Sequence, residues 1–227
     1  MCQSLQGQHH GRMTQHRPTS RDYRPAAGRD AFLPFYDAFT AALGAAKVHG
    51  ALIDQAELAA GQRVLEIGCG TGNVTVRAKR THPDVELVGS DPDPLALARA
   101  RRKARNLNGI RFEQGYGQQL PYADGSFDRV LSALMFHHLD HDTKVATAAE
   151  VARVLRPGGR LHLVDFTGHA HGIHGFLAQR MAKAAHLDDD LAQLLGAAGL
   201  DCERTATRRH PVLGNIAYYR AVRPTDR

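Results

Sequence analysis

The segment from Val64 to Gly72, with the sequence VLEIGCGTG, constrains the fold most, because a short apolar run leads directly into a loop with glycine at every second position. The composition and length of residues 63–67 predict a buried strand, and the residues from Val74 onward are compatible with a helix. We therefore expect the glycines at a strand-to-helix turn, where backbone amides at the helix end face a ligand. Glu66 places a carboxylate just before this loop, where it would repel a pyrophosphate. The loop thus favours an adenosine whose tail carries a positive charge.

Two other interpretations of the glycine loop remain open at this point. A dinucleotide fingerprint requires the pattern GxGxxG, and here Asn73 occupies the sixth place. An ordinary tight turn also uses glycine in this way. The choice between them depends on the segments that follow.

The second informative segment ends at an acidic residue. Residues 85–90 predict a second buried strand, which leads into Asp91, 19 positions after Gly72. Because neighbouring parallel strands end at the same edge of a sheet, we expect the carboxylate of Asp91 to accept both hydroxyls of a ribose. The alternative role, a helix N-cap, fits Asp93 better, since it directly precedes Pro94 and a helical run over residues 95–106.

The rest of the chain alternates predicted strands and helices. Residues 110–114 predict a third strand, and Leu120-Pro121 leads to a fourth strand within residues 125–132. Pro157-Gly158-Gly159 is expected to stop a helix before a fifth strand at residues 161–166. A helix at 187–198 and strands at 200–207 and 216–222 follow. This alternation predicts an α/β domain, with a parallel sheet covered by helices on both faces.

The order and spacing of these segments resemble a known family. The pattern ExGxGxG at Glu66, Gly68, Gly70 and Gly72, together with Asp91 and the later phrases, is similar to class I S-adenosylmethionine (SAM) dependent methyltransferases. Within that class the chain resembles the ubiquinone/menaquinone C-methyltransferase-like (methyltransferase type 11) branch, over roughly residues 30–223. The resemblance implies a Rossmann-like, doubly wound seven-stranded sheet with strand order 3-2-1-4-5-7-6 and an antiparallel seventh strand. It also implies a helical cap from residues 32–60 and a second cap from residues 169–187.

The resemblance further implies an enzyme that uses SAM to methylate a small-molecule or lipid-like acceptor on carbon, nitrogen or oxygen. The residues that it assigns to cofactor binding are Glu66, Gly68, Gly70, Gly72, Asp91, Pro92, Tyr116, Gly117 and Ala133. One position departs from the family, which commonly has Gly-Asp-Ala after the third strand where this chain has Gly115-Tyr116-Gly117. The phenol of Tyr116 either accepts a weaker hydrogen bond from adenine or lies against the purine ring.

Catalysis of methyl transfer requires mainly alignment and exclusion of water, because the sulfonium methyl group is already activated. A base is needed only when the acceptor must lose a proton. His137 and His138 follow the fourth predicted strand, where the pocket of the family opens, and are the candidate bases, with His137 nearer to the strand end. The alternative is that the pair packs against or caps the following segment.

No metal site is predicted. His169, His171 and His174 have the spacing HxHxxH, but no carboxylate or cysteine follows until Asp188, and a chain with 14 histidines forms such clusters by chance. We expect a flexible cap loop that contacts the substrate there. The three cysteines are too few for a disulfide framework, and we expect Cys69 to pack without reacting.

The net charge of +6 does not indicate nucleic-acid binding, because it is concentrated at one end. Residues 1–29 carry a net charge of +4 and predict a disordered basic tail, which leaves a nearly neutral methyltransferase domain at residues 30–227. The Asn/Asp-Pro-Pro motif of base-directed methyltransferases is replaced by residues 132–136, SALMF. A basic cluster is assigned to a solvated helix face; it consists of Arg99, Arg101, Arg102, Lys103, Arg105 and Arg111. The sequence has no apolar run long enough for a membrane span and no signal-like start, so a cytoplasmic location is expected.

Two alternative functions are kept: a SAM-binding module without catalysis, and a dinucleotide-binding oxidoreductase with a degenerate glycine loop. Asp91 does not separate them, because both SAM and NAD contain a ribose. Glu66, Asn73 and Pro157-Gly158-Gly159 favour SAM.

Overall fold

The structure is a computed structural model, which describes residues 44–167, 187–210 and 214–225 of the chain. Its helices and strands are α2 (Ala45–Ala56), β1 (Arg63–Ile67), α3 (Asn73–Thr81), β2 (Glu86–Asp91), α4 (Pro94–Lys103), β3 (Ile110–Gln114), β4 (Phe127–Ala133), the 3-10 helix η2 (Phe136–His138), α5 (His141–Val154), β5 (Leu155–Phe166), α7 (Leu187–Ala197), β6 (Asp201–His210) and β7 (Gly214–Val222).

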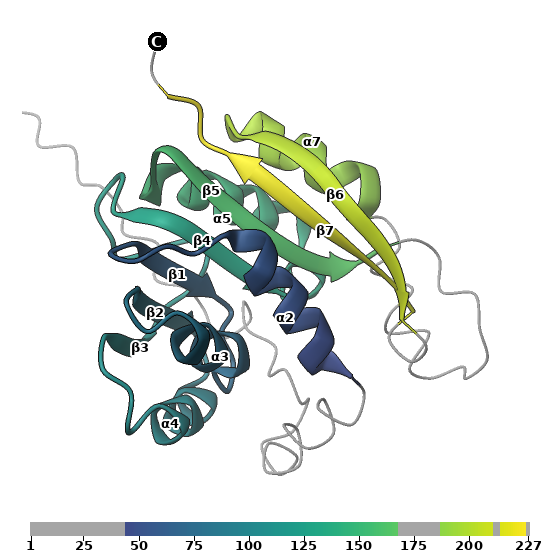
Figure 1. The fold of residues 1–227 in the computed structure, drawn as a ribbon. Coiled ribbons are helices and arrows are strands. Elements are labelled where there is room, and N and C mark those ends of the chain that lie inside the picture. The colour runs from purple at the N-terminus through teal and green to yellow at the C-terminus, as the bar shows by residue number, and fades with distance from the viewer. Residues whose placement is uncertain (1–43, 168–186, 211–213, 226–227) are drawn as a thin grey trace, which may run out of the picture.

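The seven strands form one sheet with the order β3-β2-β1-β4-β5-β7-β6 (Figure 1). The five strands from β1 to β5 are parallel, whereas β7 pairs antiparallel with both β5 and β6. This confirms the predicted strand order and the antiparallel seventh strand.

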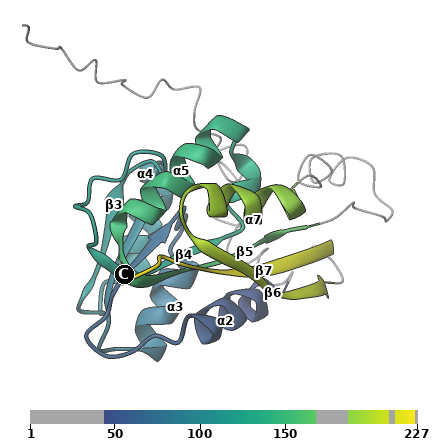
Figure 2. The same ribbon diagram turned by 90° about the horizontal axis from the view of Figure 1, so that it is seen from above.

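Helices cover both faces of the sheet (Figure 2). On one face, apolar residues of α2 and α3 such as Leu52 and Val74 pack against the sheet. On the other face, residues of α5 and α7 such as Val151 and Leu195 do so. The central strands are therefore buried from both sides, and nearly every residue of β1 and β4 is buried. The edge strand β6 is mostly exposed.

The turn from β2 to α4 follows the prediction. The side chain of Asp93 accepts hydrogen bonds from the backbone amides of Leu95 (2.8 Å) and Ala96 (3.3 Å), so it caps the N-terminus of α4, with Pro94 in the first turn. The carboxylate of Asp91 is thereby left for another role.

The segment around Pro157 differs from the prediction. Helix α5 ends at Val154, and β5 begins at the next residue, so Pro-Gly-Gly lies inside the strand and does not end the helix. The pairing of β5 with β4 shifts register there. The backbone amide of Gly158 instead donates to the carbonyl of Arg223 (2.8 Å), and the amide of Arg223 donates to the carbonyl of Gly159 (2.9 Å). Backbone pairing with the segment after β7 therefore extends the strand through residues that favour a turn in isolation.

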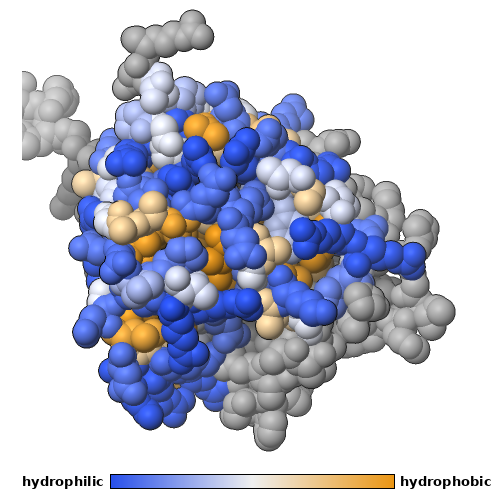
Figure 3. Space-filling view, in the orientation of Figure 1, coloured by the Kyte–Doolittle hydropathy of each residue, from blue (hydrophilic) through white to orange (hydrophobic). Residues whose placement is uncertain are grey.

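Hydrophilic residues cover most of the described surface in the view of Figure 3, and apolar residues are exposed there in scattered areas. Among the described residues, Leu95 and Val145 are the large apolar side chains that are exposed. Within the same part of the chain, every helix is too short or too polar to cross a membrane. The predicted tail at 1–29, the first part of the first cap (residues 32–43), the second cap at 169–187 apart from Leu187, and the HxHxxH residues lie outside the described residues.

Candidate active site

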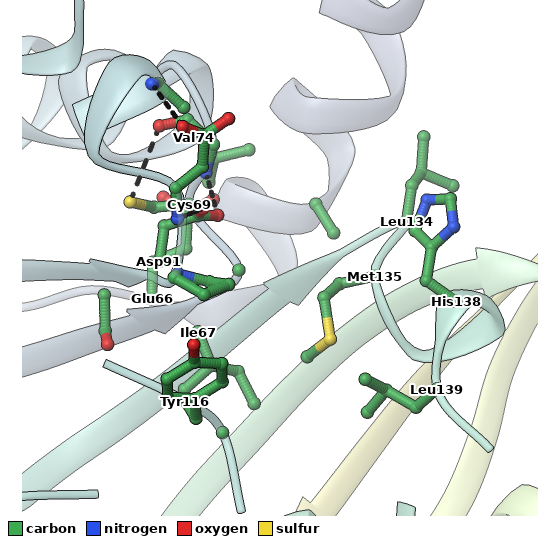
Figure 4. Close-up of a pocket in the computed structure, with 18 of the residues that line it drawn as sticks. Glu66, Ile67, Cys69, Val74, Asp91, Tyr116, Leu134, Met135, His138 and Leu139 are labelled. Carbon is green, nitrogen blue, oxygen red and sulfur yellow. Dashed lines mark hydrogen bonds between the residues drawn. The ribbon is translucent and has the colours of Figure 1, made fainter. Parts of the chain in front are cut away.

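A cavity of about 490 Å³ lies at the edge of the sheet where β1, β2 and β4 end (Figure 4). Ligands of open α/β sheets bind at this carboxyl edge, and the volume is within the usual range for small-molecule sites. Ten of the eleven residues predicted from the sequence line it: Glu66, Gly68, Gly70, Asp91, Pro92, Tyr116, Gly117, Ala133, His137 and His138. The eleventh, Gly72, does not line the cavity.

The three glycines of the loop all have a positive φ, yet they serve different purposes. A Cβ added to Gly70 would meet no atom within 4 Å, so a side chain there would extend into the cavity. At Gly72 it would lie 2.8 Å from the Cβ of Ala100, which makes this glycine a packing requirement against α4. At Gly68 it would clash with the side chain of Met135, which lies against the loop. The alternating pattern therefore combines one ligand-facing glycine with two that allow close packing.

Glu66 is a buried carboxylate at the end of β1, with only 2% of its surface exposed. The hydroxyl of Thr75 in α3 donates to its carboxylate. Burial is the main cause that raises the pKa of Glu66 to about 8, and the nearby Asp91 adds to the rise. The cavity thus contains a carboxyl group that a cationic ligand would stabilise in its ionised form.

Asp91 is the last residue of β2, and its side chain binds the backbone of the glycine loop. Its carboxylate accepts hydrogen bonds from the backbone amides of Gly70 (2.7 Å) and Asp93 (2.9 Å). Burial raises its pKa, although these two amides oppose the rise. A carboxylate has about four lone-pair directions, so two remain for hydroxyl groups of a ligand in the cavity.

Tyr116 follows β3 and forms an isolated bridge with Gln119. Both Tyr116 and Ile67 line the cavity and are labelled in Figure 4. Gly117 packs closely against α5, because an added Cβ would be 3.0 Å from the methyl group of Thr147. These positions suit an aromatic ring that lies along a flat ligand such as adenine.

Strand β4 ends in a sharp change of direction at Leu134, which has a φ of 54°, a left-handed conformation that is rare for leucine. The backbone amide of Leu134 donates to the carbonyl of Val164 in β5 (2.8 Å), which holds the turn. The chain then forms the short helix η2, so that Met135, His137 and His138 line the cavity.

The two histidines differ in their surroundings. The ring of His137 is hydrogen-bonded through Nδ1 to the carboxylate of Asp165 (2.7 Å), and its backbone amide donates to the same carboxylate (3.2 Å). Its ring also contacts Phe166 edge to face, with the ring centroids 4.7 Å apart. His138 is exposed and lies against His137, with ring centroids 3.8 Å apart. The structure thus fixes the orientation of His137 through a buried acid and leaves its Nε2 as the remaining ring nitrogen.

Sequence reasoning missed two residues of this site. Asp165 is almost fully buried in β5, and a signal for it was present, since an acidic residue within an apolar strand usually has a specific partner. His49 of α2 lines the cavity together with Ala45, one helical turn away. No feature of the sequence marked His49, because its position depends on how α2 packs across the sheet.

The basic cluster that the sequence assigned to a solvated helix face is only partly solvated. The ammonium group of Lys103 donates to the hydroxyl of Thr71 (3.0 Å) and to the side-chain oxygen of Asn73 (2.7 Å), and Arg101 donates to the carbonyl of Phe112 (2.8 Å). Lys103 therefore binds the glycine loop at Thr71 and the start of α3 at Asn73.

The cavity fits SAM by these observations. Gly70 has no side chain, so its backbone leaves room for the ligand. The buried carboxyl group of Glu66 lines the cavity and has no ion-pair partner among the described residues. The carboxylate of Asp91 has lone pairs left for the hydroxyls of a ribose. The carboxyl groups of Glu66 and Asp91 would repel a negatively charged pyrophosphate.

Comparisons with known proteins agree with this fit. Residues 64–159 match the family described as a methyltransferase domain. The chain is 45% identical to demethylmenaquinone methyltransferase of Deinococcus radiodurans over 116 residues, which are 50% of this chain and 47% of that protein. It is 40% identical to 27-O-demethylrifamycin SV methyltransferase of Amycolatopsis mediterranei over 112 residues, 48% of this chain and 40% of that one. The chain thus spans about half the length of curated relatives that it matches.

Solved structures show the same fold. The YcgJ protein of Bacillus subtilis aligns with a TM-score of 0.64 at 20% identity, covering 78% of this chain and 98% of that one. Phosphoethanolamine N-methyltransferase 2 of Haemonchus contortus, solved with SAM, aligns with a TM-score of 0.65 at 17% identity, covering 79% and 53%. The alternative of a dinucleotide-binding oxidoreductase finds no support in these comparisons, and SAM is the cofactor that they support. Residues 64–159 of the chain thus match a methyltransferase domain, and the chain is similar to methyltransferases of the ubiquinone/menaquinone-like branch.

Proposed function

We propose that the chain transfers the methyl group of SAM to a small-molecule or lipid-like acceptor whose attacking site is activated by loss of a proton, as in a phenol, a hydroquinone or an enol. The observation that carries this proposal is the hydrogen bond of 2.7 Å between Nδ1 of His137 and the buried carboxylate of Asp165. A histidine held in this way is arranged to accept a proton at its other nitrogen.

The proposal divides the cavity into two halves. The cofactor half consists of the glycine loop with Glu66, Asp91 and Tyr116, and the acceptor half consists of residues 134–139 with Asp165. SAM supplies a methyl group that is already activated for in-line displacement. In the cofactor half, Glu66 and Asp91 bind and orient the cofactor, while Gly70 leaves the space that it needs.

In the acceptor half, His137 takes the proton from the acceptor at Nε2. The buried carboxylate of Asp165, only 1% exposed, accepts the hydrogen bond from Nδ1–H, which fixes the tautomer and stabilises the imidazolium that results. Leu134, Met135 and Leu139 add an apolar wall that excludes water from the acceptor.

The relatives support this acceptor class. The names of two of them specify methylation of demethylmenaquinone and of the 27-oxygen of a demethylrifamycin. A quinone becomes a hydroquinone with two acidic hydroxyl groups on reduction, so both acceptors are compatible with a base near the methyl donor. We extend the proposal to a cytoplasmic enzyme that acts on small molecules and not on nucleic acid.

The direct test is a methyl-transfer assay with SAM that carries a tritiated methyl group. Demethylmenaquinone would be supplied in its reduced and oxidised forms, beside simple phenols as further acceptors. We expect label in the product with the reduced form and little with the oxidised form. Transfer to both forms at equal rates would argue against proton removal by the enzyme, and failure of SAM to bind in a parallel titration would contradict the methyltransferase assignment itself.

A further inference from the structure

One wall of the cavity comes from α2, where His49 lines the cavity and is half-buried. Its ring forms no hydrogen bond or ion pair with any described residue. A half-buried imidazole without a partner, at the wall of a ligand cavity, is a group that a ligand can satisfy.

The surroundings of His49 are positively charged. Burial, followed by the charges of Arg77 and Lys103, lowers its pKa to about 4, so the ring is neutral near pH 7 and still offers one N–H donor. Arg77 packs over α2, where its guanidinium donates to the carbonyl of Ala46 (2.5 Å). Lys103 donates to Thr71 and Asn73, at the start of α3.

The N-terminal end of α3 adds to the positive potential around His49. Asn73 is the first residue of the nine-residue helix, and Gly72 at the N-cap offers no capping side chain to the first amides. Thr71, Asn73 and Val74 line the cavity beside His49. The N-terminus of α3, the positive charges of Arg77 and Lys103 near His49, and the imidazole N–H of His49 together favour a carboxylate.

The cavity lining also contains acidic residues. Glu66, Asp91 and Asp93 all line it, and none of them forms an ion pair with a described residue. The tail of SAM is an amino acid with one ammonium and one carboxylate group, and a cavity with acidic and basic walls matches both of its charges.

We infer that His49 is a positioning residue that donates a hydrogen bond to the carboxylate of the methionine part of SAM. This inference rests on the proposed function and deepens it, since it assigns a residue outside the glycine loop to the cofactor. His49 thereby connects α2, which lines the cavity, to the bound cofactor.

The test compares ligands that differ in this carboxylate. Binding of SAM, S-adenosylhomocysteine, decarboxylated SAM and 5′-methylthioadenosine would be measured by calorimetry with the full chain and with His49→Ala. We expect the variant to lose about tenfold or more in affinity for the two ligands that carry the carboxylate, and less than about twofold for the two that lack it. His49→Gln, which keeps an N–H donor, should retain most of the affinity for SAM.

His141→Ala is the matched control, because His141 is an exposed histidine at the start of α5 and does not line the cavity. Equal losses for ligands with and without the carboxylate, or no loss in His49→Ala, would overturn the inference. If the unmodified chain binds none of the four ligands, the proposed function fails instead. Thermal denaturation of each variant separates loss of fold from loss of binding.

Discussion

The cofactor half of the cavity is made largely of backbone and of carboxylates at the ends of neighbouring strands, whereas the acceptor half is made of side chains that meet from β4, η2 and β5. The backbone amide of Gly70 donates to the side-chain carboxylate of Asp91 (2.7 Å), and Asp91 ends β2 while Gly70 lies shortly after β1, so their positions follow from the sheet. His137 and Asp165 are 28 residues apart and meet only because the chain reverses after β4. In the proposed function, cofactor binding is therefore largely fixed by the sheet, while the proposed proton transfer depends on one pair of side chains.

The largest effect is expected in the cofactor half at Gly70. Gly70→Asn should remove measurable SAM binding, because the new side chain extends into the cavity, while the fold should persist, since asparagine tolerates the φ of 51° at this position. Calorimetry and thermal denaturation would measure the two quantities. Gly61→Asn is the control, since Gly61 has a similar positive φ and open space around its Cβ but lies outside the cavity. Retained SAM affinity in Gly70→Asn would show that the ligand does not pass over this loop.

The next effect concerns Asp91. Asp91→Ala should weaken SAM binding by about 2 to 4 kcal/mol, because charge-assisted hydrogen bonds to the ribose are lost and the amide of Gly70 loses its acceptor. Equilibrium titration would measure the change. Asp93→Ala, which removes the cap of α4, should instead cost about 1 kcal/mol of folding stability with a smaller effect on binding. Equal effects of the two variants on SAM affinity would mean that Asp91 serves only the turn.

The acceptor half is tested by His137. We expect His137→Ala to slow single-turnover methyl transfer by about 100-fold, with SAM affinity unchanged, because it removes the base and leaves the cofactor half intact. Asp165→Asn should slow the reaction in the same way by disturbing the tautomer of His137. His138→Ala should have a smaller effect, since His138 is exposed. An unchanged rate in both His137 and His138 variants would leave alignment and desolvation as the whole source of catalysis.

The smallest effect is a dependence of folding stability on pH that originates in the cofactor half. Because the pKa of Glu66 is raised to about 8 in the folded protein, the folded state holds a proton that the unfolded chain releases at lower pH. The resulting stability is complete below the unfolded pKa and is lost as pH rises through about 8. His49 and His162, whose pKa values are lowered to about 4 and about 3, act in the opposite direction, but only below the ordinary histidine pKa near 6.5.

Between pH 6.5 and 8 the contribution of Glu66 should therefore dominate among these three groups. We expect urea denaturation of the free protein to show stability falling in this window, by at most about 1.4 kcal/mol per pH unit. Glu66→Gln should flatten the profile. A slope that survives in Glu66→Gln would assign the pH dependence to another group.

The sequence predicted the parts of the molecule that local patterns determine. The apolar strands, the glycine turn and the cap by Asp93 each depend on a few consecutive residues, and all three are confirmed. The predicted strand order came from resemblance and is confirmed as well. The position of Gly72 shows the limit of such patterns, because its packing against Ala100 of α4 depends on two helices that are separate in the chain.

The features that the sequence did not predict depend on contacts between distant segments. Pro-Gly-Gly joins β5 because the backbone of Arg223, far along the chain, pairs with it. His49 reaches the cavity only because α2 crosses the sheet beside α3. The sequence shows Asp165 as an acidic residue within an apolar strand. It does not show that His137 is its partner, because His137 reaches Asp165 only through the position of η2.

The left-handed backbone conformation of Leu134 affects how acceptor specificity can change in a protein with this turn. Holding leucine at a φ of 54° costs about 1 to 2 kcal/mol, which the surrounding structure must supply. In return the turn is a short corner, anchored to β5 by the hydrogen bond from Leu134 to Val164, rather than a long loop of variable length. New acceptors are then best accommodated by exchanging the side chains carried on this corner, such as Met135 and Leu139, with the backbone kept as it is. Libraries for altered specificity would accordingly vary those side chains and leave Leu134 untouched.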